Sequence, residues 1–215
     1  MKINPENDVF AVNKPKGISS FQAIKIIRNA LKVKKIGHAG TLDPLARGIL
    51  VVLIGKATKK QGEFMNQEKE YIAEIYLGAT SETDDAECPI SIIVSSQDTI
   101  LKKPTQKEIK IVLKNFVGEI EQIPPIYSAV KISGMRAYKL ARRGEMPKLK
   151  PRKITIKEIK ILKYKWPVLE IKVVCSSGTY IRSLARDIGK KLGVGGYLQN
   201  LVRTRSGEFN IKDTI

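Results

Sequence analysis

The sequence has few of the residues on which metal centres, disulfide frameworks and membrane spans depend. Its 215 residues include only two cysteines and one histidine. Cys88 and Cys175 are far apart and lack metal-ligand spacing, so we expect reduced thiols and no metal. No apolar run reaches the length of a membrane span, and the N-terminus has no signal-peptide pattern. These absences predict a cytoplasmic protein.

Acidic residues are also scarce relative to basic ones. Asp and Glu total 21 against 39 Lys and Arg, which gives a formal net charge of 39 − 21 = +18. A charge of this size disfavours the compact state by self-repulsion, so we expect a polyanionic partner. Nucleic acid is the first candidate, because no basic helix has the large apolar face that a membrane surface would bind. A solvated lysine-rich surface is the alternative.

The length and the hydrophobic pattern indicate a mixed fold with its own core. A chain of 215 residues buries roughly 70% of its unfolded surface without help from metals or disulfides. Apolar patterns predict strands at 48–54, 69–77 and about 169–175. Helices are predicted after Ser19 or Ser20, from the capping box of Thr105 and Glu108 to Gly118, and from after Ser177-Gly178-Thr179 to near Gly193. This mixture predicts an α+β domain with a largely antiparallel sheet.

Basic residues gather between positions 126 and 152, where core signals are few. They are Lys131, Arg136, Lys139, Arg142, Arg143, Lys148, Lys150 and Arg152. We interpret this stretch as a basic insertion over one face of the domain.

The segment from Gly37 to Gly48 (GHAGTLDPLARG) is the densest in unusual residues. It contains three glycines, the single histidine His38, and Asp43 followed by proline. Its local chemistry suits a glycine-rich turn that leads into the buried strand. A functional loop on top of a rigid strand is the competing interpretation.

Five sequence blocks together resemble the motifs of the TruB family of tRNA pseudouridine synthases. GHAGTLDPLARGIL is similar to the signature that carries the family's catalytic aspartate. The other blocks, in family order, are NKPKGISS from Asn13, KEY from Lys69, PPIYSAVK from Pro124 with Gly134, Arg136 and Tyr138, and SGTYIR from Ser177. The resemblance implies the pseudouridine synthase catalytic fold as a single domain over residues 1–215, with a thumb insertion at about 126–152.

The resemblance also implies a reaction that needs no cofactor. Uridine in the TΨC loop of tRNA, at position 55 in tRNA numbering, would be flipped out of its stack and isomerised to pseudouridine. The C–N glycosidic bond breaks and C5 of the base joins the ribose. A carboxylate must attack the substrate or stabilise positive charge on the sugar, and Asp43 is the candidate. Attack on the sugar and attack on the base both remain open.

Two further residues are implied to act beside Asp43. Tyr71 would accept and return a proton and stack on the base, but a phenol with a pKa near 10 needs activation by its surroundings. Arg182 would pair with Asp43, keep it ionised and orient it. The alternatives are an ordinary core tyrosine and a solvated helix arginine.

The family pattern also supplies candidate residues for substrate binding. Tyr71, Tyr180 and Leu201 would line the uridine pocket, although Leu201 also suits a plain core position. His38 would lie near the target base as an uncharged imidazole. The candidates for RNA contacts are Lys14, Lys131, Arg136, Arg142 and Arg143.

The sequence departs from the family pattern in two places. The family segment Thr-Asp-Thr-x-Asp-Ala is matched between Ser81 and Ala86 only at Thr83, Asp85 and Ala86, which leaves its polar network open. Many members continue into a C-terminal RNA-binding domain of the PUA type, whereas this sequence ends at Ile215. We therefore expect no PUA domain, and we expect affinity for tRNA to come from the charge of the catalytic domain.

Two other functions are compatible with part of the pattern. A non-catalytic RNA-binding protein or tRNA chaperone fits the charge, but it would not require Asp43, Tyr71 and Arg182 together. A guide-dependent rRNA pseudouridine synthase is a relative that depends on extra partner-binding surface and a C-terminal domain. We expect a monomer that acts on the T-arm of tRNA.

Overall fold

The computed structural model describes residues 3–93, 102–132 and 134–214. The chain divides into two compact units. The first unit comprises residues 1–72, 174–177 and 200–215, and the second comprises residues 73–173 and 178–199. Within the described ranges, no helix is both long and apolar enough to cross a membrane. The expectations of one catalytic domain and of no PUA domain stay predictions.

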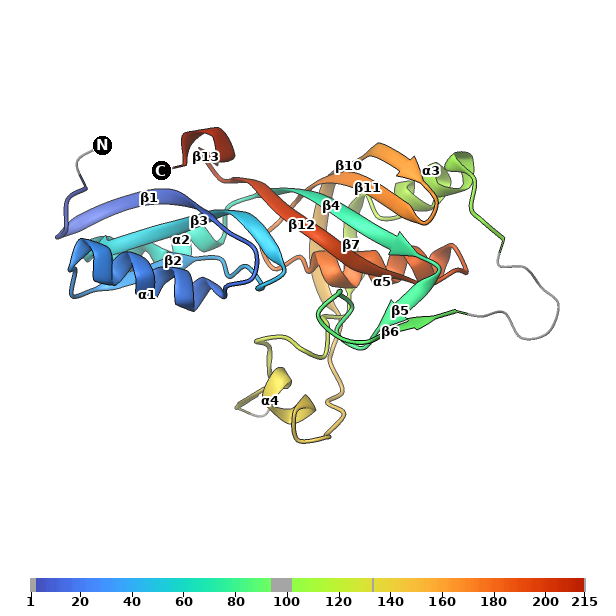
Figure 1. Cartoon of the computed structure of the whole chain (residues 1–215), viewed down its shortest axis with the longest axis horizontal. Coiled ribbons are helices and arrows are strands. Elements are labelled where there is room, and N and C mark those ends of the chain that lie inside the picture. The colour runs from blue at the N-terminus through green and yellow to red at the C-terminus, as the bar shows by residue number, and fades with distance from the viewer. Residues whose placement is uncertain (1–2, 94–101, 133, 215) are drawn as a thin grey trace. The chain divides into compact units, whose positions relative to one another are not determined.

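Hydrogen bonds link the strands in the order β1-β3-β12-β4-β11-β10-β7, with β2 on β3 and β13 on β12 (Figure 1). The elements that lie wholly or partly in the first unit are β1 (Asn7–Lys14), α1 (Ser20–Leu31), β2 (Ile36–Ala39), β3 (Ala46–Gly55), η1 (Lys56–Lys60), α2 (Gln61–Met65), β4 (Lys69–Leu77), β11 (Val168–Cys175), β12 (Gly196–Ser206), β13 (Phe209–Asn210) and η2 (Ile211–Asp213). The other elements, all in the second unit, are β5 (Ala79–Ser81), β6 (Ile90–Ile92), α3 (Gln106–Lys114), β7 (Gly118–Gln122), β8 (Lys131–Ile132), β9 (Met135–Arg136), α4 (Ala137–Ala141), β10 (Arg152–Lys165) and α5 (Ile181–Lys191). β3 pairs antiparallel with β1 and β2 and parallel with β12.

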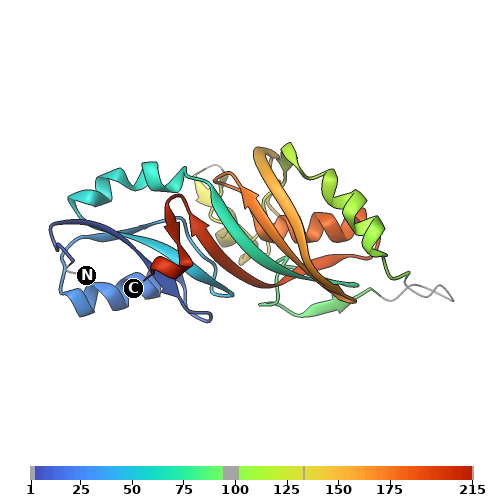
Figure 2. The same ribbon diagram turned by 90° about the horizontal axis from the view of Figure 1, so that it is seen from above.

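The first unit is built around β3, which is buried on both faces. Leu50, Val52 and Ile54 belong to one core cluster together with residues of α1, whereas Ile49, Val51 and Leu53 belong to another. Successive side chains of a strand point to opposite faces, so one apolar run supplies both clusters. Figure 2 shows α1 and α2 on opposite sides of these strands.

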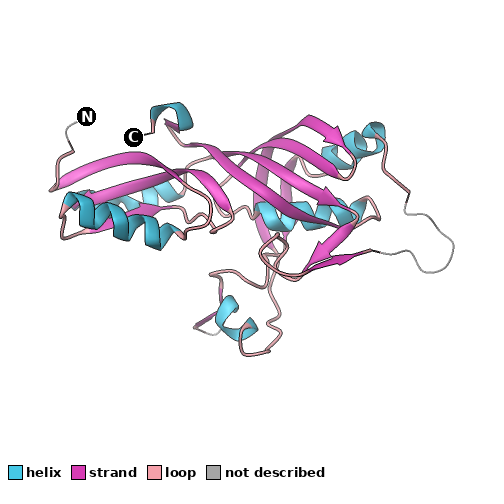
Figure 3. Cartoon of the chain, in the orientation of Figure 1, coloured by secondary structure: helices cyan, strands magenta, loops and turns pink. Residues whose placement is uncertain are grey.

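The core of the second unit comes from alternating strand residues and two helices. Ala73, Ile75 and Leu77 of β4 are buried, and their neighbours in sequence are partly exposed, as the pattern predicts. The apolar face of α5 is buried, and α3 contacts both α5 and β10. The α+β class with a mainly antiparallel sheet is confirmed (Figure 3).

Most predicted elements are present, with one wrong boundary. The Ser19 capping box starts α1 and the Thr105 capping box starts α3, as predicted. The prediction that Gly118 ends the latter helix is wrong, because α3 ends at Lys114 and Gly118 begins β7. The N–H of Asn115 reaches the carbonyls of Val112 and Leu113, a tight final turn that closes the helix without glycine.

The predicted basic insertion contains more secondary structure than a loop. The strands β8 and β9 pair with each other, and α4 follows them directly. Figure 3 shows this segment, which we call the thumb (residues 126–152, of which Ser133 lies outside the described residues), as mainly loop around the short α4.

Candidate active site

The Asp43 loop joins β2 to β3 and is held in place by the preceding N-terminal segment. The buried hydroxyl of Ser20 accepts a hydrogen bond from the Leu42 N–H (2.8 Å) and donates one to the Leu42 carbonyl (2.9 Å). The Gly17 N–H donates to the Pro44 carbonyl (2.8 Å), and the Ala46 N–H donates to the Asp43 carbonyl (3.0 Å). The backbone on both sides of Asp43 is therefore fixed, as pre-organised chemistry requires.

Lys14 has a different position from the one expected of an RNA contact. Its side chain is fully buried, and its Nζ donates to the carbonyls of Pro15 (2.8 Å) and Ile18 (2.7 Å). A buried ammonium needs such partners to offset its lost hydration. Lys14 therefore holds the turn that leads into α1, and we remove it from the RNA-binding surface.

Arg203 of β12 is buried beside the same loop. Its Nε donates to the Ile49 carbonyl (2.7 Å), and its Nη2 donates to the Gly40 carbonyl (2.9 Å). A Cβ on Gly40 would lie 3.2 Å from Nη1, and a Cβ on Gly48 would lie 2.3 Å from the Arg203 carbonyl oxygen. The absence of a side chain at Gly40 and Gly48 therefore leaves room for Arg203 and its strand. This close packing explains why both positions are glycine, and a flexible turn is not needed as the reason.

Tyr71 of β4 lies within reach of both Arg203 and Asp43. Burial raises the pKa of its phenol, whereas the positive charge of Arg203 and a hydrogen bond from its guanidinium act in the opposite direction. The charge of Asp43 raises the same pKa further. The first unit thus brings together the predicted carboxylate, the predicted phenol and an arginine that was not predicted.

His38 and Leu201 also lie in the first unit. Burial and the nearby Arg203 lower the pKa of His38, which favours the uncharged imidazole. Its Nδ1 is buried, and no hydrogen-bond partner for this atom is found among the described residues. Leu201 is buried on β12, where it pairs with Ala46 at the end of the Asp43 loop.

Arg182 lies in the first turn of α5 and is buried, unlike a solvated helix arginine. Its Nη1 donates to the Thr83 carbonyl, and its Nη2 donates to the Tyr127 carbonyl, both at 3.0 Å. It also forms an ion pair with Asp85 (3.4 Å). Arg182 belongs to the second unit and Asp43 to the first, so their predicted pairing stays a prediction.

The segment that departs from the family pattern still forms a polar network. The Thr83 hydroxyl donates to Asp85 Oδ1 (2.6 Å), and the Glu87 N–H donates to the same oxygen (3.0 Å). Asp84 forms an ion pair with Arg186 (2.7 Å), and this pair opposes the rise in the Asp84 pKa that burial causes. Although only three positions of this segment match the family pattern, its residues still form a connected polar network.

Tyr180 caps α5 and is fixed through its backbone. Its N–H donates to Gln122 Oε1 (2.8 Å), and Gln122 Nε2 donates to its carbonyl (3.1 Å). The Ser183 hydroxyl donates to the Ile123 carbonyl (2.8 Å), so the start of α5 also holds the residues just before the thumb.

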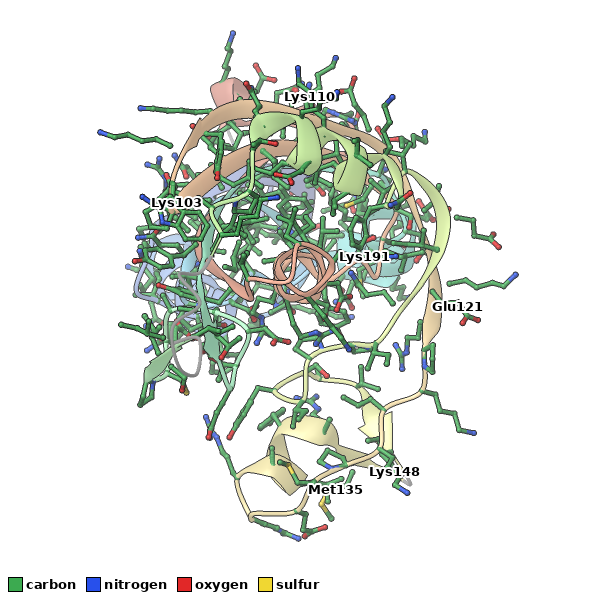
Figure 4. The ribbon with its side chains drawn as sticks, turned by 90° about the vertical axis from the view of Figure 1, so that its right-hand side faces the viewer. Lys103, Lys110, Glu121, Met135, Lys148 and Lys191 are labelled. Carbon is green, nitrogen blue, oxygen red and sulfur yellow. The ribbon has the colours of Figure 1, made fainter. Side chains whose placement is uncertain are left out.

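The basic candidates of the thumb are exposed. Lys131, Arg136, Arg142 and Arg143 all face solvent. A hollow of about 560 Å³ is lined by Lys131, Gly134, Met135, Arg136, Tyr138 and Lys139. The Arg142 guanidinium lies over the Tyr138 ring at 5.7 Å from its centroid, and Figure 4 shows Met135 and Lys148 in the same segment.

Sequence reasoning missed the buried polar residues that support the site. Arg203, Ser20 and Gln122 have no role in the predicted set, and Lys69 was noted only as part of a motif. Nothing in the alternation Leu201-Val202-Arg203-Thr204-Arg205 distinguishes the buried Arg203 from the partly exposed Arg205. Among the described residues, no group of three or more His, Cys, Asp or Glu side chains is placed to hold a metal ion.

Two family models cover most of the chain. Residues 28–181 match the model described as TruB family pseudouridylate synthase (N terminal domain). Residues 182–215 match the model described as tRNA pseudouridylate synthase B C-terminal domain.

Curated relatives match along nearly the whole chain. A tRNA pseudouridine synthase B of Bacteroides fragilis is 46% identical over 216 residues, which cover 98% of this chain and 91% of the relative. The protein of the same name from Parabacteroides distasonis is 48% identical over 95% of this chain and 87% of its own length. The one from Clostridium kluyveri is 46% identical over 96% of this chain and 70% of its own length.

Solved structures match with lower identity. A chain in a Cbf5-Nop10-Gar1 complex has a TM-score of 0.73 and 32% identity over 96% of this chain. A chain in an H/ACA RNP bound to a substrate RNA containing 2'-deoxyuridine has a TM-score of 0.68 and 29% identity over 94% of this chain. This chain spans about half the length of each.

Proposed function

Because the chain belongs to the TruB family of pseudouridylate synthases, we propose that it converts uridine to pseudouridine in tRNA, in the TΨC loop at position 55. The observation that carries this proposal is the fixed Asp43 loop, with Tyr71 and Arg203 beside it in the same unit. The relatives named tRNA pseudouridine synthase B support tRNA as the substrate.

In the proposed reaction, Asp43 attacks the substrate or stabilises positive charge on the sugar while the C–N bond breaks. The base turns, its C5 bonds to the ribose carbon, and C5 loses its proton while N1 gains one. Tyr71 accepts and returns a proton during this sequence. Arg182 pairs with Asp43 and orients it, and the network from Thr83 to Asp85 supports Arg182 from within the second unit.

Flipping the uridine out of folded tRNA costs a few kcal/mol, which contacts to base and backbone must offset. We assign the base contacts to His38, Tyr71, Tyr180 and Leu201, and the uncharged imidazole of His38 suits stacking or hydrogen bonding there. The backbone contacts come from the exposed thumb residues Lys131, Arg136, Arg142 and Arg143.

A non-catalytic RNA-binding protein would not need this buried arrangement, because binding to phosphates calls only for exposed cations. The chain is 48% identical to a tRNA pseudouridine synthase B but 29% identical to the chain in the H/ACA RNP, which favours tRNA over a guide-dependent rRNA substrate. We also propose that the protein acts on the T-arm as a monomer in the cytoplasm. The cytoplasmic location agrees with Cys88 and Cys175 both being free thiols.

The test is release of tritium from tRNA carrying C5-tritiated uridine, because C5 loses its hydrogen in this reaction. The purified chain should release one tritium per tRNA. A tRNA transcript with cytidine at position 55 is the matched control and should release none above background. Equal release from both transcripts would contradict the assigned position, and no release from either would contradict the proposed reaction.

A further inference from the structure

The N-terminal part of the first unit carries positive charge that the proposed reaction does not use. Asp and Glu are absent from residues 9–42 of the sequence, whereas seven Lys and Arg lie there. Lys14 is buried, and the other six are exposed. These exposed cations are Lys16, Lys25, Arg28, Lys32, Lys34 and Lys35. This stretch therefore presents charge of one sign, which attracts a polyanion.

Four exposed residues form one stripe along α1. Phe21, Lys25 and Arg28 follow at spacings of four and three residues, which places them on the same face, and Lys32 follows four residues later as the helix cap. We call these four residues the α1 stripe. At about 1.5 Å of rise per residue its three cations extend over roughly 10 Å, long enough to meet successive phosphates of one strand. In the part of the chain that the structure describes, no carboxylate forms an ion pair with any of the three cations.

The aromatic ring of Phe21 distinguishes the α1 stripe from a solvated lysine surface. The side chain is 75% exposed, although burial would stabilise a ring of this size. Ile26 is exposed too, but it lies about 140° around the helix from Phe21, so the two form no single apolar face for a membrane. A ring beside cations suits nucleic acid, because an unpaired base stacks on the ring while phosphates meet the cations.

The α1 stripe begins next to the Asp43 loop. The Ser20 hydroxyl is hydrogen-bonded to both the N–H (2.8 Å) and the carbonyl (2.9 Å) of Leu42, the residue before Asp43. Phe21 follows Ser20 directly, so its backbone is fixed close to this loop. Lys32 lies roughly 16 Å further along the helix axis. An RNA whose uridine reaches Asp43 therefore has its neighbouring nucleotides within reach of α1.

We propose that the α1 stripe is a second RNA-binding surface, separate from the thumb, which binds the T-arm of tRNA next to the target uridine. Lys25, Arg28 and Lys32 contact backbone phosphates, and an unpaired base of the T-loop stacks on Phe21. This inference rests on the proposed function and deepens it, because it gives the first unit its own contacts with the substrate.

The first test replaces the three cations with glutamine, which removes the charge and keeps a good helix former. An isolated T-arm stem-loop transcript is titrated with Lys25→Gln/Arg28→Gln/Lys32→Gln at several salt concentrations. Each lost phosphate contact should flatten the log-log salt slope by about 0.7 to 0.9, so this variant should lose about two to three units. Its affinity at moderate salt should fall by about ten- to hundredfold. The KM for tRNA should rise in parallel, whereas kcat should change much less.

The matched control removes the same charge from another part of the first unit. Lys56, Lys59 and Lys60 of η1 are exposed. The helix α2 follows η1 directly and lies on the opposite side of the strands from α1 (Figure 2). Lys56→Gln/Lys59→Gln/Lys60→Gln should therefore keep a salt slope and an affinity close to those of the wild type.

The second test addresses the ring. Phe21→Ala should lower the affinity for the same stem-loop by about five- to hundredfold, which is the contribution of one stacked base. Phe21→Tyr retains a ring for stacking and should bind like the wild type. Ile26→Ala, at an exposed position of α1 outside the stripe, is the control and should also bind like the wild type.

Superimposable salt slopes for the wild type and the α1 triple variant would overturn the inference. Equal flattening in the η1 control would also overturn it, because net charge alone would then explain the loss. Wild-type affinity in Phe21→Ala would refute the stacked base. These titrations require no turnover, whereas absence of tritium release from the wild-type chain would refute the proposed function, so the two failures are distinguishable.

Discussion

The Asp43 centre and the thumb differ in how they use positive charge. At the centre, Lys14 and Arg203 are buried, and backbone carbonyls fix both cations. In the thumb, Lys131, Arg136 and Arg143 are exposed to solvent. Buried cations act at short range on neighbouring groups, whereas exposed cations are screened by salt and release counterions when they meet phosphates. Chemistry and affinity should therefore respond to different substitutions.

The largest effect should come from the Asp43 carboxylate. Asp43→Asn keeps the shape of the side chain and removes its charge and nucleophilicity, so pseudouridine formation should fall to background. Binding of tRNA should persist, because the thumb is unchanged. Tritium release and a filter-binding titration measure the two quantities on one preparation. Substantial turnover by the purified variant would remove Asp43 from its role.

Tyr71→Phe should have the next largest effect. It retains the ring for stacking and removes the hydroxyl that is proposed to transfer a proton. Turnover should drop by about 10²- to 10⁴-fold if the hydroxyl transfers a proton, with little change in binding. Tyr76→Phe on the same strand is the matched control. Similar turnover in the two variants would mean that the Tyr71 hydroxyl transfers no proton and that only its ring contributes, by stacking.

These two residues also show how far the sequence can lead. The five motif blocks predict the fold class, the Asp43 loop and Tyr71, because such residues stand out by type and spacing. The buried Arg203 and Ser20 could not be predicted, since burial depends on contacts between segments such as Ser20 with Leu42. The capping box predicts where α3 begins, but its end depends on the tight turn at Asn115 and not on the next glycine.

Substitutions in the thumb should lower the affinity for tRNA without lowering turnover at saturating tRNA. Replacing Arg142, Arg143 and Lys148 with Ala should weaken tRNA binding and flatten the log-log salt slope by about two to three units, at about 0.7 to 0.9 per lost phosphate contact. Turnover at saturating tRNA should change much less. Titrations at several salt concentrations check this, and superimposable slopes would refute the RNA-binding assignment of the thumb.

The smallest effect should be a pH dependence of stability from Lys69, which is buried next to Tyr71 on β4. Its Nζ contacts the carbonyls of Met65 and Gln67, and burial together with the nearby Arg203 lowers its pKa from 10.5 to about 8. Between these two pH values the unfolded chain keeps a proton that the folded chain has lost. The free energy of unfolding should therefore rise with pH across this window, by at most about 1.4 kcal/mol per pH unit.

Lys69→Met removes this titration, so the difference in unfolding free energy between wild type and variant should change with pH from 8 to 10.5 and stay constant below 8. Urea denaturation at pH 7, 8, 9 and 10 measures it, and other titrating groups cancel in the difference. Lys59→Met, at an exposed position of the same unit, is the control and should give a difference independent of pH. A constant difference for Lys69→Met as well would mean that the Lys69 ammonium is as well stabilised in the folded protein as in water, so that Lys69 adds a second buried positive charge to that of Arg203 in this unit.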